Sequence, residues 1–405
     1  MSWREITLGA AIHVKHGYAF KGEFFADSGR YIVLTPGNFN EQGGFRIRPE
    51  KDRAYTVDFP ETYVLNEGDL IVAMTEQGPG LLGSSALVPE ADRYLHNQRL
   101  GLVDQIDPSS LEKRFLYYLF NTHSVRGQIN GSASGTKVRH TSPERIYQVR
   151  VRVPDVRTQG KIADTLSAYD DLIENNRRRM ALLEESARLL YREWFVRLRF
   201  PGHEHTRIVD GVPEGWERKT ALDSFQVLSG GTPKTTNPDY WGGETPFYTP
   251  KDATDGIWVT DCERTITDLG LKNCNSKLYP KETVFISARG TVGKLNMAQR
   301  PMAMSQSCYA LIGKNHLSQS FVFAAMQVAV NALRQQAVGA VFDAIIVDTF
   351  KRIEVLVPDA KIIRLFDETI RPMFEQVENL TLQNQKLRAA RDLLLPRLMS
   401  GEMSV

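Results

Sequence analysis

One stretch of the chain, residues 158–195, carries apolar side chains at alternating spacings of three and four residues. The stripe begins at Ile162, ends at Trp194 and contains one polar member, Asn176. A mean spacing of 3.5 makes a narrow apolar face, which favours a helix packed along a single long partner helix. About 33 residues at ~1.5 Å rise give a rod of roughly 50 Å. An ordinary surface helix on a domain core is the alternative interpretation.

The same stripe recurs 204 residues later, from Phe366 to Leu398, with Asn384 inside it. Residues before the stripes also match, although the offset there is 213 to 214, and Trp3 then corresponds to Trp216. Insertions in loops produce such a drift. The chain is therefore predicted to be a tandem duplication of a ~200-residue unit, each unit being a globular half followed by a long helix.

Shorter patterns predict the elements of the two halves. Apolar runs bounded by Gly, Pro and Asn indicate strands, and 3.6-residue periodicity indicates helices. In the first half we expect strands at 31–35, 69–74 and 148–153, a helix at 111–121, and loops at 77–83 and 131–137. In the second half we expect strands at 283–287 and 352–357 and a helix at 321–337. Each half is interpreted as a mixed α/β domain, and the strand order does not follow from the sequence.

These patterns predict an α+β protein in which two similar mixed α/β domains are joined by two long helices. A chain that returns after a second globular half, with a pseudo-two-fold axis, should pair its helices as an antiparallel coiled coil. The expected segments are an N-terminal domain, a central helix, a C-terminal domain and a C-terminal helix, at residues 1–157, 158–200, 201–358 and 359–405.

The two asparagines predict the register of the helix pair. An unpaired amide in an apolar seam is costly, so Asn176 and Asn384 should meet. This register then places Trp194 opposite Phe366 at one end of the seam.

Composition narrows the class of protein. The 405 residues suffice for two to three domains, and no apolar run approaches the ~20 residues that span a membrane. The N-terminal residues resemble no secretory signal. Three cysteines, at 262, 274 and 308, form no CxxC pattern, so neither a zinc site nor a disulfide framework is predicted, and a cytoplasmic location is expected.

Net charge is only +2, which does not by itself indicate a nucleic-acid-binding protein. Between residues 126 and 157, however, seven Lys and Arg face two acidic residues, a local excess of five positive charges. Such a segment would suit DNA phosphates, and a solvated surface would look similar, so both interpretations stay open.

Two apparent catalytic motifs do not hold. The segment Asn237–Tyr240 resembles the Asn-Pro-Pro-Tyr motif of adenine methyltransferases, but its third residue is Asp and no glycine-rich cofactor loop precedes it. The segment Gly290–Lys294 resembles part of a phosphate loop, but Ala288 and Leu295 stand where Gly and Ser or Thr are needed. No catalytic residue and no metal site is predicted.

Several longer segments carry a family resemblance. GGTPKT, YWGGETPFYTPKDA, ISARGTVGK, MSQSCYAL and RDLLLPRLMSGEM in the second half, together with VRVRVPDVRTQGKIADTLSAYDDLIENNRRRM in the first, are similar to specificity subunits of type I restriction-modification enzymes. The resemblance covers essentially the whole chain. It implies two target-recognition domains joined by two conserved helices, and a protein that recognises DNA without catalysis.

The resemblance also implies partners. Members of this family bind an asymmetric, bipartite double-stranded DNA target, one half-site per domain. Their helices hold two methyltransferase subunits, and restriction-translocase subunits join for cleavage. Cofactors are not expected on this chain, because S-adenosylmethionine, ATP and Mg belong to the partner subunits.

Candidate DNA-contacting residues are polar side chains on loops at matched positions of the two halves, since base readers need adaptable loops on a rigid scaffold. In the first half they are Lys15, His16, Tyr18, Lys21, Asn38, Glu76, Asn97, Gln98, Arg99, Ser134, Lys137 and Arg139. In the second half they are Thr232, Lys234, Thr235, Tyr248, Lys251, Asp252, Arg289, Lys294, Ser305, Gln306 and Asp343.

Two alternatives remain beside a full restriction-modification complex. A recognition subunit of a modification-only or other defence system would differ in lacking a nuclease-translocase partner. A self-sufficient DNA adenine methyltransferase would bind a methyl donor directly, and the missing glycine-rich loop argues against it.

Overall fold

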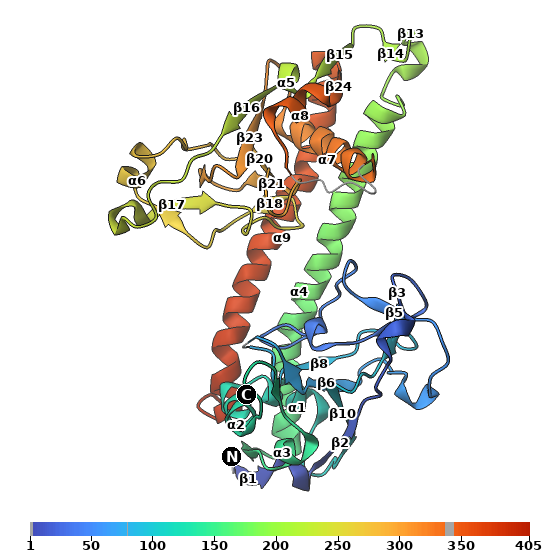
Figure 1. Cartoon of the computed structure of the whole chain (residues 1–405), viewed down its shortest axis with the longest axis vertical. Helices are drawn as coiled ribbons and strands as arrows, with labels where there is room; N and C mark the ends of the chain where they lie inside the picture. Colours follow the sequence, from blue (N-terminus) through green and yellow to red (C-terminus); the bar gives the residue numbers. More distant parts are fainter. Residues whose placement is uncertain (1–2, 79, 337–343) are drawn as a thin grey trace. The chain divides into compact units, whose positions relative to one another are not determined.

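A computed structural model describes residues 3–78, 80–336 and 344–405, which form two compact units. Unit 1 comprises Met1–Asp171 and Leu387–Val405, and unit 2 comprises Leu172–Lys386. Two long helices, α4 (Val156–Tyr191) and α9 (Ala360–Ser400), each contribute to both units (Figure 1). They coincide with the two apolar stripes of the sequence.

Unit 1 contains a four-stranded central sheet in the order β2-β10-β6-β8 and a second sheet in the order β3-β5-β4-β9. Its strands are β1 (Arg4–Thr7), β2 (Ile12–His16), β3 (Phe25–Ala26), β4 (Tyr31–Val33), β5 (Arg53–Tyr55), β6 (Leu70–Ala73), β7 (Thr75–Glu76), β8 (Ser85–Leu87), β9 (Tyr94–Leu95), β10 (Leu100–Ile106), β11 (Arg139–His140) and β12 (Arg150–Val153). Its short helices are α1 (Lys113–Phe120), α2 (His123–Ser132) and α3 (Pro143–Tyr147).

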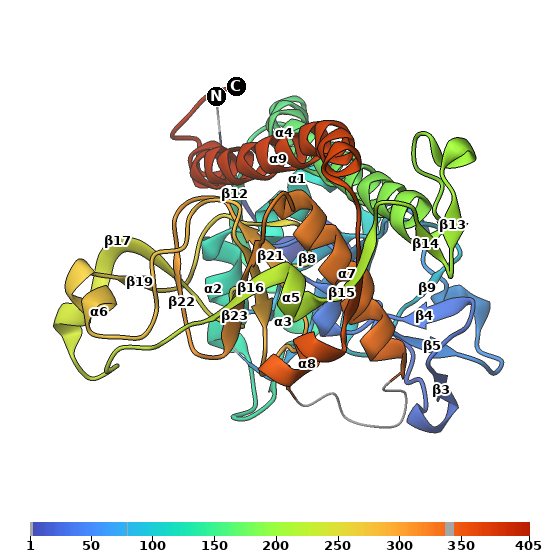
Figure 2. The ribbon, with the colours of Figure 1, turned by 90° about the horizontal axis from the view of Figure 1, so that it is seen from above.

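Unit 2 contains a five-stranded sheet in the order β16-β23-β20-β21-β18, and α5 and α7 lie against it (Figure 2). Its strands are β13 (Ile208–Val209), β14 (Val212–Pro213), β15 (Glu217–Thr220), β16 (Phe225–Ser229), β17 (Trp241–Tyr248), β18 (Trp258–Val259), β19 (Thr265–Ile266), β20 (Val284–Ser287), β21 (Leu295–Ala298), β22 (Ala303–Met304), β23 (Cys308–Gly313) and β24 (Glu354–Val357). Its short helices are α5 (Ala221–Ser224), α6 (Asp268–Lys272), α7 (Gln319–Gln336) and α8 (Val347–Arg352).

The two units share one topology. The strand sequence β2-β10-β6-β8 of unit 1 recurs as β16-β23-β20-β21 in unit 2, and the pair β1-β12 recurs as β15-β24. A parallel pair, β4 with β9, likewise recurs as β17 with β22. The duplication predicted from the sequence is thus a duplication of the fold.

Each central sheet separates two apolar cores, because successive side chains of a strand point to opposite faces. In β6, Leu70 and Val72 join the core that includes the long helices, whereas Ile71 joins a second core. In β20, Val284 and Phe285 divide in the same way. The long helices are therefore part of the core of each unit.

The helices run antiparallel within each unit. In unit 2, Asn176 Nδ2 donates to Asn384 Oδ1 at 3.0 Å, and the rings of Trp194 and Phe366 lie 5.8 Å apart. The asparagine contact predicted from the stripe is confirmed by this hydrogen bond. In unit 1, Arg391 donates to Asp170 Oδ1 at 2.5 Å. A salt bridge therefore lies within the helix pair of unit 1.

The element predictions differ from the structure at some boundaries. Helix α4 ends at Tyr191 and a π-helical turn, Arg192–Val196, follows, whereas a helix to residue 200 was expected. Leu198 has a positive φ of 58°, which ends the helix there. The expected loop at 131–137 begins later, because α2 extends to Ser132 through the buried Val125 and Ile129. The division into four segments stays a prediction.

Candidate nucleic-acid interface

Many candidate residues of unit 1 converge at one end of its central sheet. His16 pairs with Gly101 and Ala73 pairs with Leu100, so β2 and β6 both end beside the start of β10. The loop that contains Gln98 and Arg99 precedes that start, and both side chains are exposed. This end of the sheet therefore gathers polar side chains from segments far apart in the sequence.

Glycine makes this convergence possible. A Cβ atom on Gly17 would lie 2.0 Å from the carbonyl oxygen of Asn97, so a larger residue does not fit. In unit 2, a Cβ on Gly230 would lie 2.2 Å from the carbonyl oxygen of Ser305. The two glycines are matched in the repeat because both allow the same close approach of two backbone segments.

The corresponding sheet end of unit 2 gathers its candidates in the same way. Ser229 and Ser287 end their strands beside Tyr309 and Cys308, at the start of β23. The Thr232 hydroxyl there donates a hydrogen bond to Gln306 Oε1. The candidate side chains that are exposed in the two units are His16, Lys21, Gln98, Arg99, Ser134, Lys137, Lys234, Thr235, Lys251, Arg289 and Gln306.

Several other candidates are partly buried. Lys15 donates to the Thr62 carbonyl at 2.9 Å and lies 4.7 Å from the ring centroid of Tyr63. Tyr18 packs against the same Tyr63 ring, at 5.3 Å between centroids. Arg139 Nη1 donates to Asn130 Oδ1 at 2.9 Å. These contacts hold the side chains within unit 1, beside the exposed candidates.

Asn38 and Asp252 hold equivalent turns, and for the buried Asn38 the expectation of a DNA contact is corrected. Asn38 is 1% exposed, and its Oδ1 accepts from the Thr35 amide at 2.9 Å. Asp252 Oδ2 accepts from the Thr249 amide at 2.8 Å. Thr35-Pro36 and Thr249-Pro250, which match at an offset of 214, thus begin the same turn. A side-chain acceptor three residues after the threonine closes this turn in each unit.

Glu76 also has an internal role that the sequence did not reveal. It is 3% exposed, and its Oε2 accepts hydrogen bonds from the backbone amides of Gly80, Leu81 and Leu82 at 2.9–3.1 Å. Its other oxygen, Oε1, lies 3.5 Å from a guanidinium nitrogen of Arg139. A buried carboxylate with these partners organises the following loop, so the expected DNA contact is corrected here as well.

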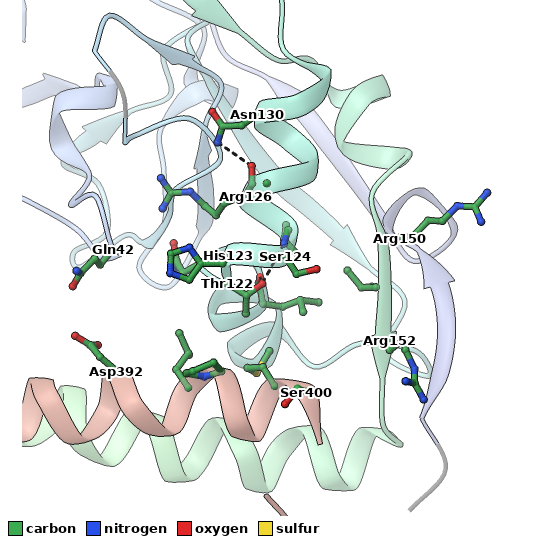
Figure 3. A pocket seen from close by; sticks show the side chains of 18 of the residues that line it. Gln42, Thr122, His123, Ser124, Arg126, Asn130, Arg150, Arg152, Asp392 and Ser400 are labelled. Carbon is green, nitrogen blue, oxygen red and sulfur yellow. Dashed lines mark hydrogen bonds between the residues drawn. The ribbon is translucent and has the colours of Figure 1, made fainter. Parts of the chain in front are cut away.

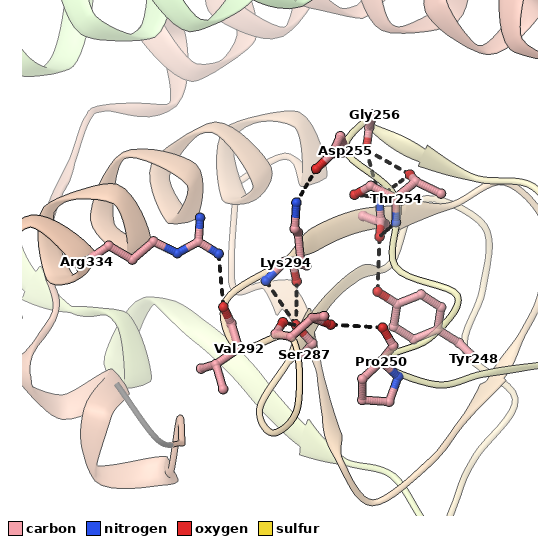
Figure 4. Close-up of polar contacts among 11 residues, drawn as sticks. Tyr248, Pro250, Thr254, Asp255, Gly256, Ser287, Val292, Lys294 and Arg334 are labelled. Atoms are coloured by element: carbon pink, nitrogen blue, oxygen red, sulfur yellow. Dashed lines mark hydrogen bonds and ion pairs between the residues drawn. The ribbon is translucent and has the colours of Figure 1, made fainter. Parts of the chain in front are cut away.

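Three further candidates are also internal. Tyr248 is fully buried, and its hydroxyl donates to Asn296 Oδ1 at 3.0 Å (Figure 4). Asn97 and Ser305 are 8% and 6% exposed, and both lie in the loop that approaches the glycine. Asn97 and Ser305 therefore help to hold the backbone at the sheet end, and their side chains are not exposed there. Lys294 keeps partial exposure and forms an ion pair with Asp255. Asp343 lies outside the described residues.

The basic segment 126–157 divides between internal and exposed arginines. Arg126 donates from Nε to the Leu82 carbonyl at 3.2 Å, and Arg145 donates to Ser134 Oγ at 2.9 Å. By contrast, Arg150 and Arg152 are exposed on β12 beside a cavity of about 1010 Å³ (Figure 3). Part of the positive charge of this segment therefore binds groups inside the unit.

His96 is a residue that sequence reasoning missed. It is fully buried, its Nε2 lies 2.9 Å from the Leu100 carbonyl, and its Nδ1 has no hydrogen-bond partner. Burial lowers the pKa of His96 to about 4, so the ring is neutral at pH 7. The ring therefore donates from Nε2 to the Leu100 carbonyl and so stabilises the loop that contains Gln98. A histidine directly after an apolar strand was the only available signal.

Within the described residues, no group of three or more His, Cys, Asp or Glu side chains is arranged to hold a metal ion. Among the helices of those residues, none is both long and apolar enough to cross a membrane.

Comparison with known proteins identifies the family. A family model described as the type I restriction modification DNA specificity domain matches residues 2–185 and again residues 213–390. The chain belongs to this family. The resemblance seen in the sequence is confirmed, and the two matches coincide with the two halves of the duplication. Specificity subunits of type I systems are recognition subunits, not enzymes, and bind no cofactor themselves.

Relatives of the specificity family span most of the chain. The specificity subunit of the type I restriction enzyme HindI from Haemophilus influenzae is 24% identical over 404 residues, covering 84% of this chain and 87% of the relative. The MjaIX specificity subunit from Methanocaldococcus jannaschii is 24% identical and covers 75% of this chain and 72% of the relative. A crystal structure of the S subunit of a type I system from M. genitalium has a TM-score of 0.61 at 17% identity, covering 98% and 96% of the two chains, which shows the shared fold.

Proposed function

We propose that this chain is the DNA-recognition subunit of a type I restriction-modification complex. Each unit reads one half-site of a split, asymmetric double-stranded target through the sheet end described above. The long helices hold two methyltransferase subunits, and restriction-translocase subunits join for cleavage. S-adenosylmethionine, ATP and Mg act on those partner subunits.

This proposal is supported by one comparison between the units: their backbones match at the sheet end, but the side chains exposed there differ. Both units bring the same strand ends together through the same glycine contact. Yet Thr75, which follows β6 in unit 1, is buried, whereas Arg289 is exposed at the equivalent place after β20 in unit 2. Two units with the same backbone and different polar side chains should bind two different half-sites, because side-chain donors and acceptors distinguish the base edges.

The test is methylation mapping of cells that express the chain with its methyltransferase subunits. We expect one asymmetric motif made of two short sequences and a non-specific spacer. A continuous motif or a palindrome would contradict the proposal. Methyl transfer by the isolated chain would establish the self-sufficient methyltransferase instead. DNA cleavage by the complex, with and without restriction subunits, separates a full system from a modification-only one.

A triple substitution tests the division of labour. Lys234, Lys251 and Arg289 are exposed in unit 2, and replacing all three by Ala should weaken contact with one half-site only. Lost phosphate contacts lower affinity for all sequences and flatten the salt dependence, whereas a lost base contact relaxes one position. A change in the half-site that unit 1 reads would refute the modular picture.

A further inference from the structure

The turn before β10 in unit 1 has an exact structural counterpart before β23 in unit 2. In unit 1 the Leu100 amide donates to the Asn97 carbonyl at 2.9 Å, and in unit 2 the Cys308 amide donates to the Ser305 carbonyl at 3.2 Å. Both hydrogen bonds close a four-residue turn. The second residue of the turn is a glutamine in each unit, Gln98 or Gln306.

The backbone on both sides of the turn is held equally. The Met74 amide donates to the Arg99 carbonyl at 3.0 Å, and its counterpart, the Ala288 amide, donates to the Ser307 carbonyl at 2.8 Å. These bonds tie the turn to the end of the central strand of each unit. Since neighbouring strands fix the turn, its second residue has a defined position and direction.

The opposite side of the turn is fixed by the segment that contains the matched glycine. The Tyr18 amide donates to the His96 carbonyl at 2.9 Å, and the Gly231 amide donates to the Met304 carbonyl at 3.1 Å. In unit 1 a further bond, from the Gln98 amide to the Tyr18 carbonyl at 2.9 Å, holds the glutamine backbone itself.

Both glutamine side chains are exposed although their backbones are so firmly held. Asn97 and Ser305, the first residues of the turns, are 8% and 6% exposed. A carboxamide offers one acceptor and one donor group side by side. This pair matches adenine, whose major-groove edge offers the N6 donor and the N7 acceptor.

Resting on the proposed function, we propose that Gln98 and Gln306 are the matched base readers of the two units, each contacting an adenine of its own half-site through the major groove. The rigid turn supplies the preorganisation that a bidentate contact needs, because little conformational freedom is lost on binding. In unit 2, Thr232 is a positioning residue, since its hydroxyl donates to Gln306 Oε1 and orients the amide.

The experiment uses the complex of the chain with its methyltransferase subunits, and measures methylation and binding on a library of targets randomised at each position of both half-sites. In Gln98→Ala, we expect preference for adenine at one position of one half-site to fall by roughly 5- to 140-fold. Gln306→Ala should do the same at one position of the other half-site only. Thr232→Val should reduce the preference at that same position by a smaller factor.

Matched controls are exposed glutamines away from the turns. Gln105 lies near the far end of β10 and Gln226 near the start of β16, both remote from the sheet end in question. Their alanine variants should leave every target position unchanged.

Three results would overturn the inference. If the alanine variants bound all sequences more weakly to the same extent, the glutamines would be phosphate contacts. If the variants lost the preference for a base other than adenine, the assigned chemistry would be refuted. If the preference at every position were unchanged, neither residue would belong to the interface. In each case a wild-type complex that still recognises a split target leaves the proposed function standing. A wild-type complex that recognises none refutes that function itself.

Discussion

The buried asparagine pair between α4 and α9 gives a sharp prediction for the stability of unit 2. Asn176 and Asn384 are 7% and 2% exposed, and each amide depends on the other helix for hydrogen bonding. Besides the contact between them, Asn384 Nδ2 donates to the Ile173 carbonyl at 3.3 Å. Replacing one asparagine by leucine leaves the other amide buried with a lost partner, which costs about 1–3 kcal/mol, partly offset by the apolar leucine.

We therefore expect Asn176→Leu and Asn384→Leu each to lower the free energy of unfolding of unit 2 by about 1–2 kcal/mol. The double substitution removes both amides at once and should be nearly neutral, because two apolar groups then pack in the seam. The coupling energy of the double-mutant cycle should accordingly be about 2–4 kcal/mol.

Urea unfolding followed by tryptophan fluorescence measures this, since four of the five tryptophans lie in unit 2. Each helix offers a matched control, because Asn175 in α4 and Asn379 in α9 are exposed. The pair Asn175→Leu and Asn379→Leu should shift stability by less than about 0.5 kcal/mol each, without coupling. If the effects of the buried pair simply added, the two amides would be independent and the proposed cause wrong.

Three further predictions concern other features. The pKa of His96 is about 4 in the folded chain and ordinarily about 6.5, so between these values only the unfolded state binds the proton. Unit 1 should therefore lose about 2 kcal/mol of stability as the pH falls to 5. Thermal unfolding across pH should show this loss, and the His96→Gln variant should lack it. Glu76→Ala should cost unit 1 about 2–3 kcal/mol and speed hydrogen exchange in the following loop, whereas retained protection would show that the carboxylate does not organise it. Seven-residue insertions after Arg179 and after Leu380 together add ~10 Å to the helix pair. Methylation mapping should then show a target spacer that is longer by roughly three base pairs. An unchanged spacer would show that the helices do not set its length.

Local and repeated patterns of the sequence determined the main architecture. The stripe that ends at Trp194 predicted a long helix, its recurrence at Phe366 predicted the partner, and the asparagine contact followed from the cost of an unpaired amide. The repeat itself needed only sequence positions. Such features were predictable because helical periodicity and duplication are visible within short windows of sequence.

Only the tertiary structure separated interface residues from internal ones. Asn38 and Gln98 are both polar residues near a turn, yet one is buried in a hydrogen-bonded turn and the other is exposed. Glu76 was a candidate DNA contact in the sequence, but in the fold its carboxylate accepts hydrogen bonds from three backbone amides. These differences depend on which distant segments pack around each side chain, and burial of a polar group is decided by those long-range contacts. The strand order that creates the contacts, and with it the matched position of Gln98 and Gln306, arises from pairing between strands far apart in the chain, which no local pattern encodes.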